Sequence, residues 1–340
     1  MVARGVTALG WGLMACLLSA CGGASQDAPF EDYLDRLARP LGVDVPPRNQ
    51  TTYPRSPRAG KLRLTLESDA IDALDFLALS GCELQVTIGK RNSSLGKLAR
   101  ASQRLLLELE YLRMAPACVA SLRAQGRNTL AEALESAWRQ KREQVPALIY
   151  NATLASAEYR AFWSAQRVAG DFPTVGSHVS LAALTAINEM ARRWLAGDYS
   201  ADDQQFEIYL GEVAGGSGGA VLRSLVHQQD WLDAANRLLE ARMARGPLCS
   251  TSTRHAAADI LPNVIRNYFI EGIQPRAAIM ERQRFELVTH IHALEQQLDP
   301  VLPPLYTQWR DARDSALDLA AGAPRLHVEY LKEIQAPCAS

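Results

Sequence analysis

The chain has 340 residues, of which 48% are hydrophobic and 21% charged, as in ordinary globular proteins. This length suits one large domain or two smaller ones with a well-buried core. The formal net charge is −1. Because this balance offers no broad basic surface, the sequence predicts no nucleic-acid partner and no polybasic contact with a membrane.

The first 20 residues have the layout of a secretory signal peptide. They carry one charge, Arg4, followed by an apolar stretch that is too short to span a bilayer as a helix. The stretch ends in Leu18-Ser19-Ala20-Cys21, which resembles the lipobox of bacterial lipoproteins, where lipid is attached to the thiol and the chain is cut just before it. The alternative is an ordinary signal peptide with an incidental Cys21. We expect residues 1–20 to be a lipoprotein signal peptide and Cys21 to be lipidated.

The lipidated cysteine predicts a protein that is anchored to a membrane and does not span it. Each buried methylene of the acyl chains contributes about 0.8 kcal/mol, so an anchor with more than one chain is stable. In lipoproteins of Gram-negative envelopes, an Asp after the lipidated Cys usually signals retention in the inner membrane, and this chain has Gly22 there. By this resemblance, the expected location is the periplasmic face of the outer membrane.

Four cysteines remain after the lipidation site. They are Cys82, Cys118, Cys249 and Cys338. An even number in an oxidising compartment predicts two disulfides, with three possible pairings. We prefer Cys82 with Cys118 and Cys249 with Cys338, because each pair brackets a plausible helical hairpin. No pair has C-x-x-C spacing, which argues against a redox site or a zinc site.

Residues 21–61 are predicted to be a lipidated N-terminus and a Pro-rich spacer. A short amphipathic helix around Phe30 to Leu37 is followed by several prolines in a polar context: Pro40, Pro46, Pro47, Pro54 and Pro57. This composition is typical of a semi-rigid spacer. Some 20 extended residues would reach about 65 Å, enough to hold a domain off the membrane.

Residues 62–340 are predicted to be a helical domain, because apolar residues recur at helical spacing in most of it. A brief alternation over 62–66 could be a short strand. The clearest helix runs from Leu95 to Leu112 and should end before Pro116, and Gly322 and Pro324 should interrupt the C-terminal helices. We predict an all-α fold, a multi-helix bundle of antiparallel helices after the signal peptide and Pro-rich tether.

The strongest match to an enzyme motif is Gly215-Gly216-Ser217-Gly218-Gly219, which satisfies the G-x-S-x-G pattern of serine hydrolases. The alternating apolar residues of 206–210 precede it, and a helix follows. This nucleophile elbow belongs at the edge of a parallel sheet with many strands, which the sequence does not predict. Four glycines more simply make a break between two helices. Catalysis by Ser217 is therefore the alternative, and we favour a protein that is not an enzyme.

Metal and nucleotide sites are not predicted. His290 and His292 would point about 200° apart on a helix and could not chelate one ion. Carboxylates such as Glu108 and Glu110 fall in helical contexts where charges are ordinary surface groups. Two dipeptides have the ending of a P-loop but lack its first Gly and its Ser or Thr: Gly89-Lys90 and Gly96-Lys97. We therefore expect no cofactor, no metal and no nucleotide.

A polar segment over residues 81–96 combines a cysteine with many hydrogen-bond donors. Helix capping and loop structure would explain these side chains. The functional interpretation is a polar recognition surface on a rigid bundle, with Arg91, Asn92 and Ser93 as its candidate residues.

Several segments together carry a resemblance to a known family. They are Phe30-Glu31-Asp32-Tyr33, Arg36-Leu37-Ala38, Gly81-Cys82-Glu83-Leu84-Gln85, Arg91-Asn92-Ser93-Ser94-Leu95-Gly96, Cys118 and the region around Cys249. With these segments, nearly all of the mature chain resembles a family of uncharacterised Gram-negative lipoproteins known as a domain of unknown function. The resemblance implies an envelope location and no activity. We expect a lipid-anchored protein that binds another envelope component; the alternatives are the Ser217 hydrolase and a carrier of an apolar ligand between helices.

Overall fold

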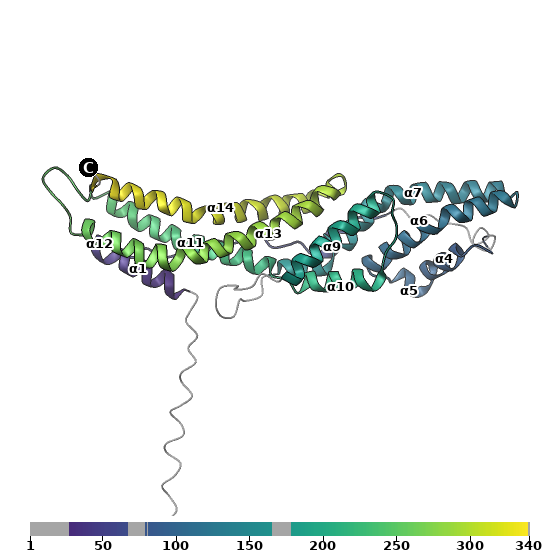
Figure 1. Ribbon diagram of the computed structural model, residues 1–340, viewed down its shortest axis with the longest axis horizontal. Helices are drawn as coiled ribbons and strands as arrows, with labels where there is room; N and C mark the ends of the chain where they lie inside the picture. The colour runs from purple at the N-terminus through teal and green to yellow at the C-terminus, as the bar shows by residue number, and fades with distance from the viewer. Residues whose placement is uncertain (1–26, 67–78, 80, 165–177, 339–340) are drawn as a thin grey trace, which may run out of the picture.

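The computed structural model describes residues 27–66, 79, 81–164 and 178–338. Figure 1 shows them as an elongated arrangement of helices. Within these ranges there is one isolated β-bridge, between Cys249 and Arg254, and no strand. The all-α class is therefore confirmed. No helix of the described ranges is both long enough and apolar enough to cross a membrane. The predicted signal peptide, residues 1–20, and the predicted lipidation site Cys21 lie outside the described residues.

Many of the helices follow one another closely, but 17 residues (42–58) separate α1 from α2 and 13 residues (244–256) separate α11 from α12. In chain order they are α1 (Ala28–Leu41), α2 (Ala59–Leu62), α4 (Leu84–Asn92), α5 (Ser94–Lys97), α6 (Ala101–Ala124), α7 (Asn128–Ala152), α8 (Ala157–Trp163), α9 (His178–Leu195), α10 (Asp203–Ala214), α11 (Gly218–Met243), α12 (Ala257–Val264), the π-helix η1 (Ile265–Ile273), α13 (Gln274–Leu298), the 3-10 turn η2 (Asp299–Val301), α14 (Pro304–Gln335) and the 3-10 turn η3 (Ala336–Cys338).

Two lobes lie at opposite ends of the molecule (Figure 1). The large lobe consists of α1 and α11 to α14, and the distal lobe consists of α4 to α7. Helices α8, α9 and α10 lie between them: α8 contacts α11 of the large lobe, α10 contacts α6 of the distal lobe, and α9 contacts both α13 and α7. The main apolar core extends from the large lobe through the central helices, while a second, smaller core fills the outer end of α6 and α7 under α4. The main helix pair of the distal lobe, α6 with α7, is antiparallel. In the large lobe, α11 lies parallel to α14, since Asn236 bonds to His327 and Glu240 to Tyr330, whereas α13 is antiparallel to α14.

Long helices of the large lobe follow the predicted apolar spacing. In α11, the side chains of Leu222, Leu225, Leu232 and Leu239 are all buried. They recur at intervals of three and seven residues and therefore share one face. The helix is followed by Gly246, whose φ of 106° is a conformation that favours glycine.

Helix boundaries near prolines differ from the predictions. The helix expected to begin at Leu95 begins at Ala101, and Leu95 remains 84% exposed. Pro116 lies inside α6, and Pro324 lies inside α14, which also continues through Gly322. A proline removes one backbone hydrogen bond but does not end a helix whose two flanks are held by packing. Both helices pack along most of their length, against α7 and α11 respectively.

The predicted spacer is wrong for its described part, residues 27–61. Phe30, Tyr33 and Leu37 of α1 are fully buried in the main core. The proline segment that follows is bound along the helical body, for example by the backbone N–H of Thr51, which donates to Asp230 Oδ2 at 3.1 Å. An amphipathic helix is stable only when its apolar face is covered, and here the large lobe covers it.

The alternating apolar residues over 62–66 lie at an extended segment that pairs with no strand among the described residues. The side chain of Asn151 on α7 takes the place of one: its Oδ1 accepts from the Leu64 N–H at 2.8 Å, and its Nδ2 donates to the Leu64 carbonyl at 2.9 Å. Leu64 and Leu66 pack against the main core. Since neighbouring side chains of an extended chain point to opposite sides, Arg63 and Thr65 are left exposed.

Candidate functional site

The preferred disulfide pairing is confirmed. Cys82 and Cys118 are joined with a Cα–Cα distance of 5.7 Å, and Cys249 and Cys338 with one of 5.0 Å. The first bridge fastens the segment before α4 to α6 in the distal lobe. The second fastens the loop after α11 to the end of α14 in the large lobe.

The structure places Ser217 between two helices. Residues 203–214, which precede it, form α10 and not a strand, so the strand–turn–helix setting of a nucleophile elbow is absent at this position. Its neighbouring glycines are explained by packing: a Cβ at Gly216 or Gly218 would lie 2.6 or 2.3 Å from the ring of Phe162. Within the described ranges, no histidine hydrogen-bonds to the Ser217 hydroxyl.

The three candidate recognition residues have different positions at the end of α4. The Arg91 side chain is only 16% exposed, and its Nε lies 2.8 Å from Glu108 Oε1. The Ser93 hydroxyl accepts from the Gly96 N–H at 3.0 Å and caps α5. Asn92 is exposed. Two of the three side chains thus have structural partners, and recognition through this segment stays a prediction.

Glu108 is not an ordinary surface group. It is buried in the distal lobe between α6 and α7, where its Oε2 lies 2.8 Å from Nζ of the equally buried Lys141. The ammonium of Lys141 also lies 5.0 Å from the ring centre of Tyr111. Glu108 comes three residues after Leu105 and four before Leu112, both of which are buried. This position on the inward stripe was a signal for its burial.

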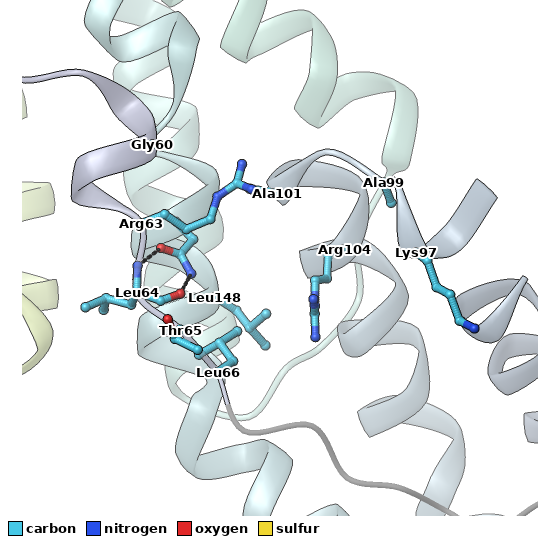
Figure 2. Close-up of a pocket in the computed structure, with 11 residues that line it drawn as sticks. Gly60, Arg63, Leu64, Thr65, Leu66, Lys97, Ala99, Ala101, Arg104 and Leu148 are labelled. Atoms are coloured by element: carbon cyan, nitrogen blue, oxygen red, sulfur yellow. Dashed lines mark hydrogen bonds between the residues drawn. The ribbon is translucent and has the colours of Figure 1, made fainter. Parts of the chain in front are cut away.

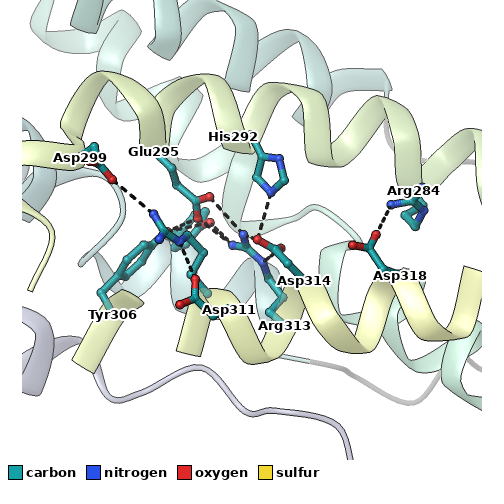
Figure 3. A network of polar contacts seen from close by, with 11 residues as sticks. Arg284, His292, Glu295, Asp299, Tyr306, Asp311, Arg313, Asp314 and Asp318 are labelled. Carbon is teal, nitrogen blue, oxygen red and sulfur yellow. Dashed lines mark hydrogen bonds and ion pairs between the residues drawn. The ribbon is translucent and has the colours of Figure 1, made fainter. Parts of the chain in front are cut away.

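The densest buried polar cluster joins α8, α13 and α14, and Figure 3 shows it. The Arg313 guanidinium binds Glu295 with two hydrogen bonds, Nη1 to Oε1 at 2.8 Å and Nη2 to Oε2 at 3.1 Å. The Tyr306 hydroxyl donates to Glu295 Oε1 at 2.5 Å, and Arg313 Nη1 also donates to the Tyr159 hydroxyl at 3.3 Å. All four side chains are buried. We call these four residues the Glu295–Arg313 network.

Burial sets the protonation of this network. It raises the pKa of both Tyr159 and Tyr306 well above the usual value, so both hydroxyls remain protonated donors. Burial alone would lower the pKa of Arg313, but the facing tyrosines and the Glu295 carboxylate outweigh it and raise that pKa. The network therefore contains a permanent ion pair and neutral tyrosines. Such groups hold three helices together and provide no activated nucleophile or base at neutral pH.

The rim of the network contains a histidine and a second carboxylate. His292 Nε2 lies 3.1 Å from Asp314 Oδ2, and Arg313 Nε donates to Asp314 Oδ1 at 2.8 Å. The hydrogen bond with Asp314 raises the pKa of His292. Burial opposes the charge on Asp314, yet its hydrogen bonds with His292 and Arg313 lower its pKa. His290, by contrast, faces α9, where its Nδ1 lies 3.3 Å from Thr185 Oγ1.

The ligand atoms of His292, Glu295 and Asp314 lie within 4.8 Å of one another, a spacing that could hold a metal ion. Both carboxylates, however, already bond to the Arg313 guanidinium. A second cation placed between them would be repelled at close range by this fixed positive charge. The arrangement thus fits an ion-pair network better than a metal centre.

A separate buried histidine joins three helices of the large lobe. His327 on α14 is fully buried; its Nε2 lies 2.7 Å from the Tyr33 hydroxyl on α1, and its Nδ1 lies 2.6 Å from Asn236 Oδ1 on α11. A carbonyl oxygen can only accept, so Nδ1 carries the proton and Nε2 accepts from the tyrosine. Burial lowers the pKa of His327 to about 3, and the ring is neutral.

Comparison with known proteins assigns the chain to a family. No curated protein and no solved structure matches the chain. The sequence model of one protein family, described as a protein of unknown function (DUF3080), matches residues 30–332. This range begins in α1 and ends near the end of α14, so it includes both lobes and the proline segment between α1 and α2. The chain therefore belongs to the DUF3080 family of proteins of unknown function.

Proposed function

We propose that the protein is a lipid-anchored component of a Gram-negative envelope, held at the periplasmic face of the outer membrane, which acts by binding another envelope component. The positions and the pairing of the cysteines support this proposal most directly. Four of the six cysteines form two disulfides, and Cys16 belongs to the expected signal peptide. Cys21 is then the one unpaired thiol of the mature chain, and it stands where a lipobox would place the lipid. Disulfides of this kind persist in oxidising compartments such as the periplasm.

The buried start of α1 alters the expected geometry of the anchor. Ala28, the first residue of α1, comes only seven positions after Cys21, a length of chain that can reach about 25 Å at most. A lipid on Cys21 would hold the large lobe close to the membrane surface. The elongated body would then present its remaining surface to partners.

Substitution of Cys21 tests the anchor. In cells given labelled fatty acid, we expect the wild-type chain in the membrane fraction with label, and Cys21→Ser without label, either unprocessed or soluble. Cys16→Ser is the matched control, because it removes a nearby thiol that should carry no lipid. A Cys21→Ser chain that remains labelled and membrane-bound would contradict the proposal.

Cross-linking in intact cells tests the binding role. We expect specific cross-linked products of the anchored chain that decrease when Cys21→Ser removes it from the membrane. A wild-type chain that gives no product beyond those of the variant would argue against a membrane-localised partner.

The alternative hydrolase is tested with a serine-directed activity probe. We expect no labelling of the wild-type chain. Stoichiometric labelling that disappears in Ser217→Ala would instead favour an envelope hydrolase.

A further inference from the structure

A pocket of about 380 Å³ lies between the extended segment 63–66, the start of α6 and the inner face of α7. Figure 2 shows the side chains around it. Among the described residues that line it, three carry a positive charge, namely Arg63, Lys97 and Arg104, and none is acidic. Leu66 and Leu148 contribute an apolar part of the wall. The volume falls within the range of small-molecule sites.

The three cations have no ionic partner among the described residues, although many arginines elsewhere on the surface do. Arg36 and Arg192, for example, each pair with an acidic residue on the same helix. Like charges that share one pocket repel one another, and solvent only partly screens them. An anion in the pocket would replace this repulsion with attraction.

Contacts on the neighbouring backbone, not ion pairs, hold these residues in place. Asn151 binds both backbone groups of Leu64 and thereby fixes the position of Arg63. The Ser93 hydroxyl caps α5, the short helix that ends in Lys97. Arg104 lies in the first turn of the 24-residue helix α6. The charged ends of the side chains therefore stay available while their attachment points are fixed.

The start of α6 adds to the positive potential. Ala101, its first residue, lines the pocket, and the first N–H groups of a helix lack helical acceptors and carry partial positive charge. An adjoining hollow of about 340 Å³ shares Arg63 and Ala101 with the pocket and contains Arg100 and Glu158. Among the described residues that line the two hollows, the acidic one, Glu158, thus lines the neighbouring hollow and not the pocket itself.

We propose that this pocket binds a phosphate group, carried either by a lipid headgroup or by a soluble phosphate compound. The planar guanidinium groups of Arg63 and Arg104 match phosphate oxygens with paired hydrogen bonds, and Lys97 adds a compact charge. The apolar wall at Leu66 and Leu148 can contact a non-polar part of the same ligand. This inference goes beyond the proposed envelope role and does not depend on the lipid at Cys21.

Calorimetric titration of the full-length chain in a maltoside detergent tests the proposal. One arm uses inorganic pyrophosphate, and the other uses dihexanoyl phosphatidylglycerol below its micelle concentration, with dihexanoyl phosphatidylcholine for comparison. Binding of pyrophosphate would identify a soluble phosphate ligand. Binding of phosphatidylglycerol without pyrophosphate would identify a lipid headgroup. In either case we expect Arg63→Gln with Arg104→Gln to weaken binding about tenfold or more, since charged hydrogen bonds are lost.

The matched control is Arg282→Gln with Arg325→Gln. These arginines on α13 and α14 are exposed and have no ion pair with a described residue, so the control changes the net charge by the same amount.

Circular dichroism and the unfolding midpoint check the fold of each variant; if the pocket variant is misfolded, Lys97→Gln replaces it. The proposal is wrong if neither probe binds, or if the control weakens binding as much as the pocket variant. The lipid anchor is tested by a different measurement, membrane fractionation. The phosphate-binding proposal and the envelope proposal can therefore fail independently.

Discussion

Each of the two lobes contains a disulfide and a buried ion pair, but the apolar core beside them is much larger in one lobe than in the other. The large lobe contains Cys249–Cys338 and the Glu295–Arg313 pair within an extensive apolar core. The distal lobe contains Cys82–Cys118 and the Glu108–Lys141 pair beside a much smaller core. Small cores leave less surface buried per residue, so cross-links and ion pairs carry more of their stability.

The two buried carboxylates differ in how many cations they contact. Glu295 has one cation, Arg313, and a tyrosine donor. Glu108 has two cations, Lys141 and the partly exposed Arg91. Removing one cation should therefore leave Glu295 without a charged partner but leave Glu108 with one. The comparison implies a more fragile ion pair in the large lobe.

Removal of the disulfides should have the largest effect. In the chain-entropy model, the bridge that spans 89 residues contributes about 4.6 kcal/mol and the bridge that spans 36 contributes about 3.8 kcal/mol. We expect Cys249→Ser with Cys338→Ser to lower the free energy of unfolding slightly more than Cys82→Ser with Cys118→Ser, as measured by urea denaturation. Reduction of both disulfides in the wild-type chain should lower its free energy of unfolding by at least as much as either double variant. A larger loss from the distal pair would show that the small core depends on its bridge beyond the entropy of the loop.

Loss of Arg313 should have the next largest effect. Arg313→Met leaves Glu295 buried without a cation, and we expect a loss of about 3 to 5 kcal/mol in urea denaturation. Arg310→Met is the control, because its partners Asp299 and Asp311 are exposed and such pairs contribute at most about 1 kcal/mol. The double variant Glu295→Met with Arg313→Met removes both charges and should recover much of the loss. Equal effects of Arg313→Met and Arg310→Met would contradict the role of the network.

The neutral His327 should make the large lobe sensitive to acid, while residues 81–152 of the distal lobe contain no histidine. The folded pKa of about 3 lies below the unfolded value near 6.5, so the unfolded chain takes up the proton first as the pH falls. The stabilisation is complete above pH 6.5 and is lost progressively down to about pH 3. We expect a loss of about 2 kcal/mol between pH 7 and pH 5, measured by urea denaturation at each pH.

His327→Gln should remove this part of the pH dependence, because glutamine does not titrate. His178→Gln is the control, since His178 is exposed at the start of α9 and should leave the pH dependence unchanged. The assignment fails if the His327 variant keeps the wild-type dependence between pH 7 and pH 5.

Loss of Lys141 should have the smallest effect of the four. Lys141→Met removes one charged hydrogen bond but leaves Glu108 paired with Arg91, so we expect a loss of about 1.5 kcal/mol by urea denaturation. Arg91→Met added to Lys141→Met should cost more than the sum of the single changes, because the carboxylate then has no cation. If Lys141→Met costs as much as Arg313→Met, the second cation does not protect Glu108.

The sequence by itself determined the fold class and the disulfide pairing. Helical spacing of apolar residues is a local property, and it predicts helices such as α11 before any partner is known. Gly197 and Gly246, which have positive φ, come just after α9 and α11, as is typical of glycines at helix ends. The preferred cysteine pairing followed from predicted hairpins, although the bridges span 36 and 89 residues. The helical spacing and the glycines at helix ends depend on residues that are close along the chain.

Tertiary structure alone decided which charged and polar groups are buried and which remain free. Glu295 and Arg313 come together from two helices, and Lys141 meets Glu108 across the α6–α7 pair. The pocket also depends on tertiary structure, because folding brings together its lining residues Arg63, Lys97 of α5 and Arg104 of α6. The position of Glu108 on an apolar stripe indicates its burial, but the sequence does not indicate which cation meets it. Whether a charge is buried and paired depends on the partner that packing brings beside it, because the cost of removing it from water is offset only by a group within bonding distance.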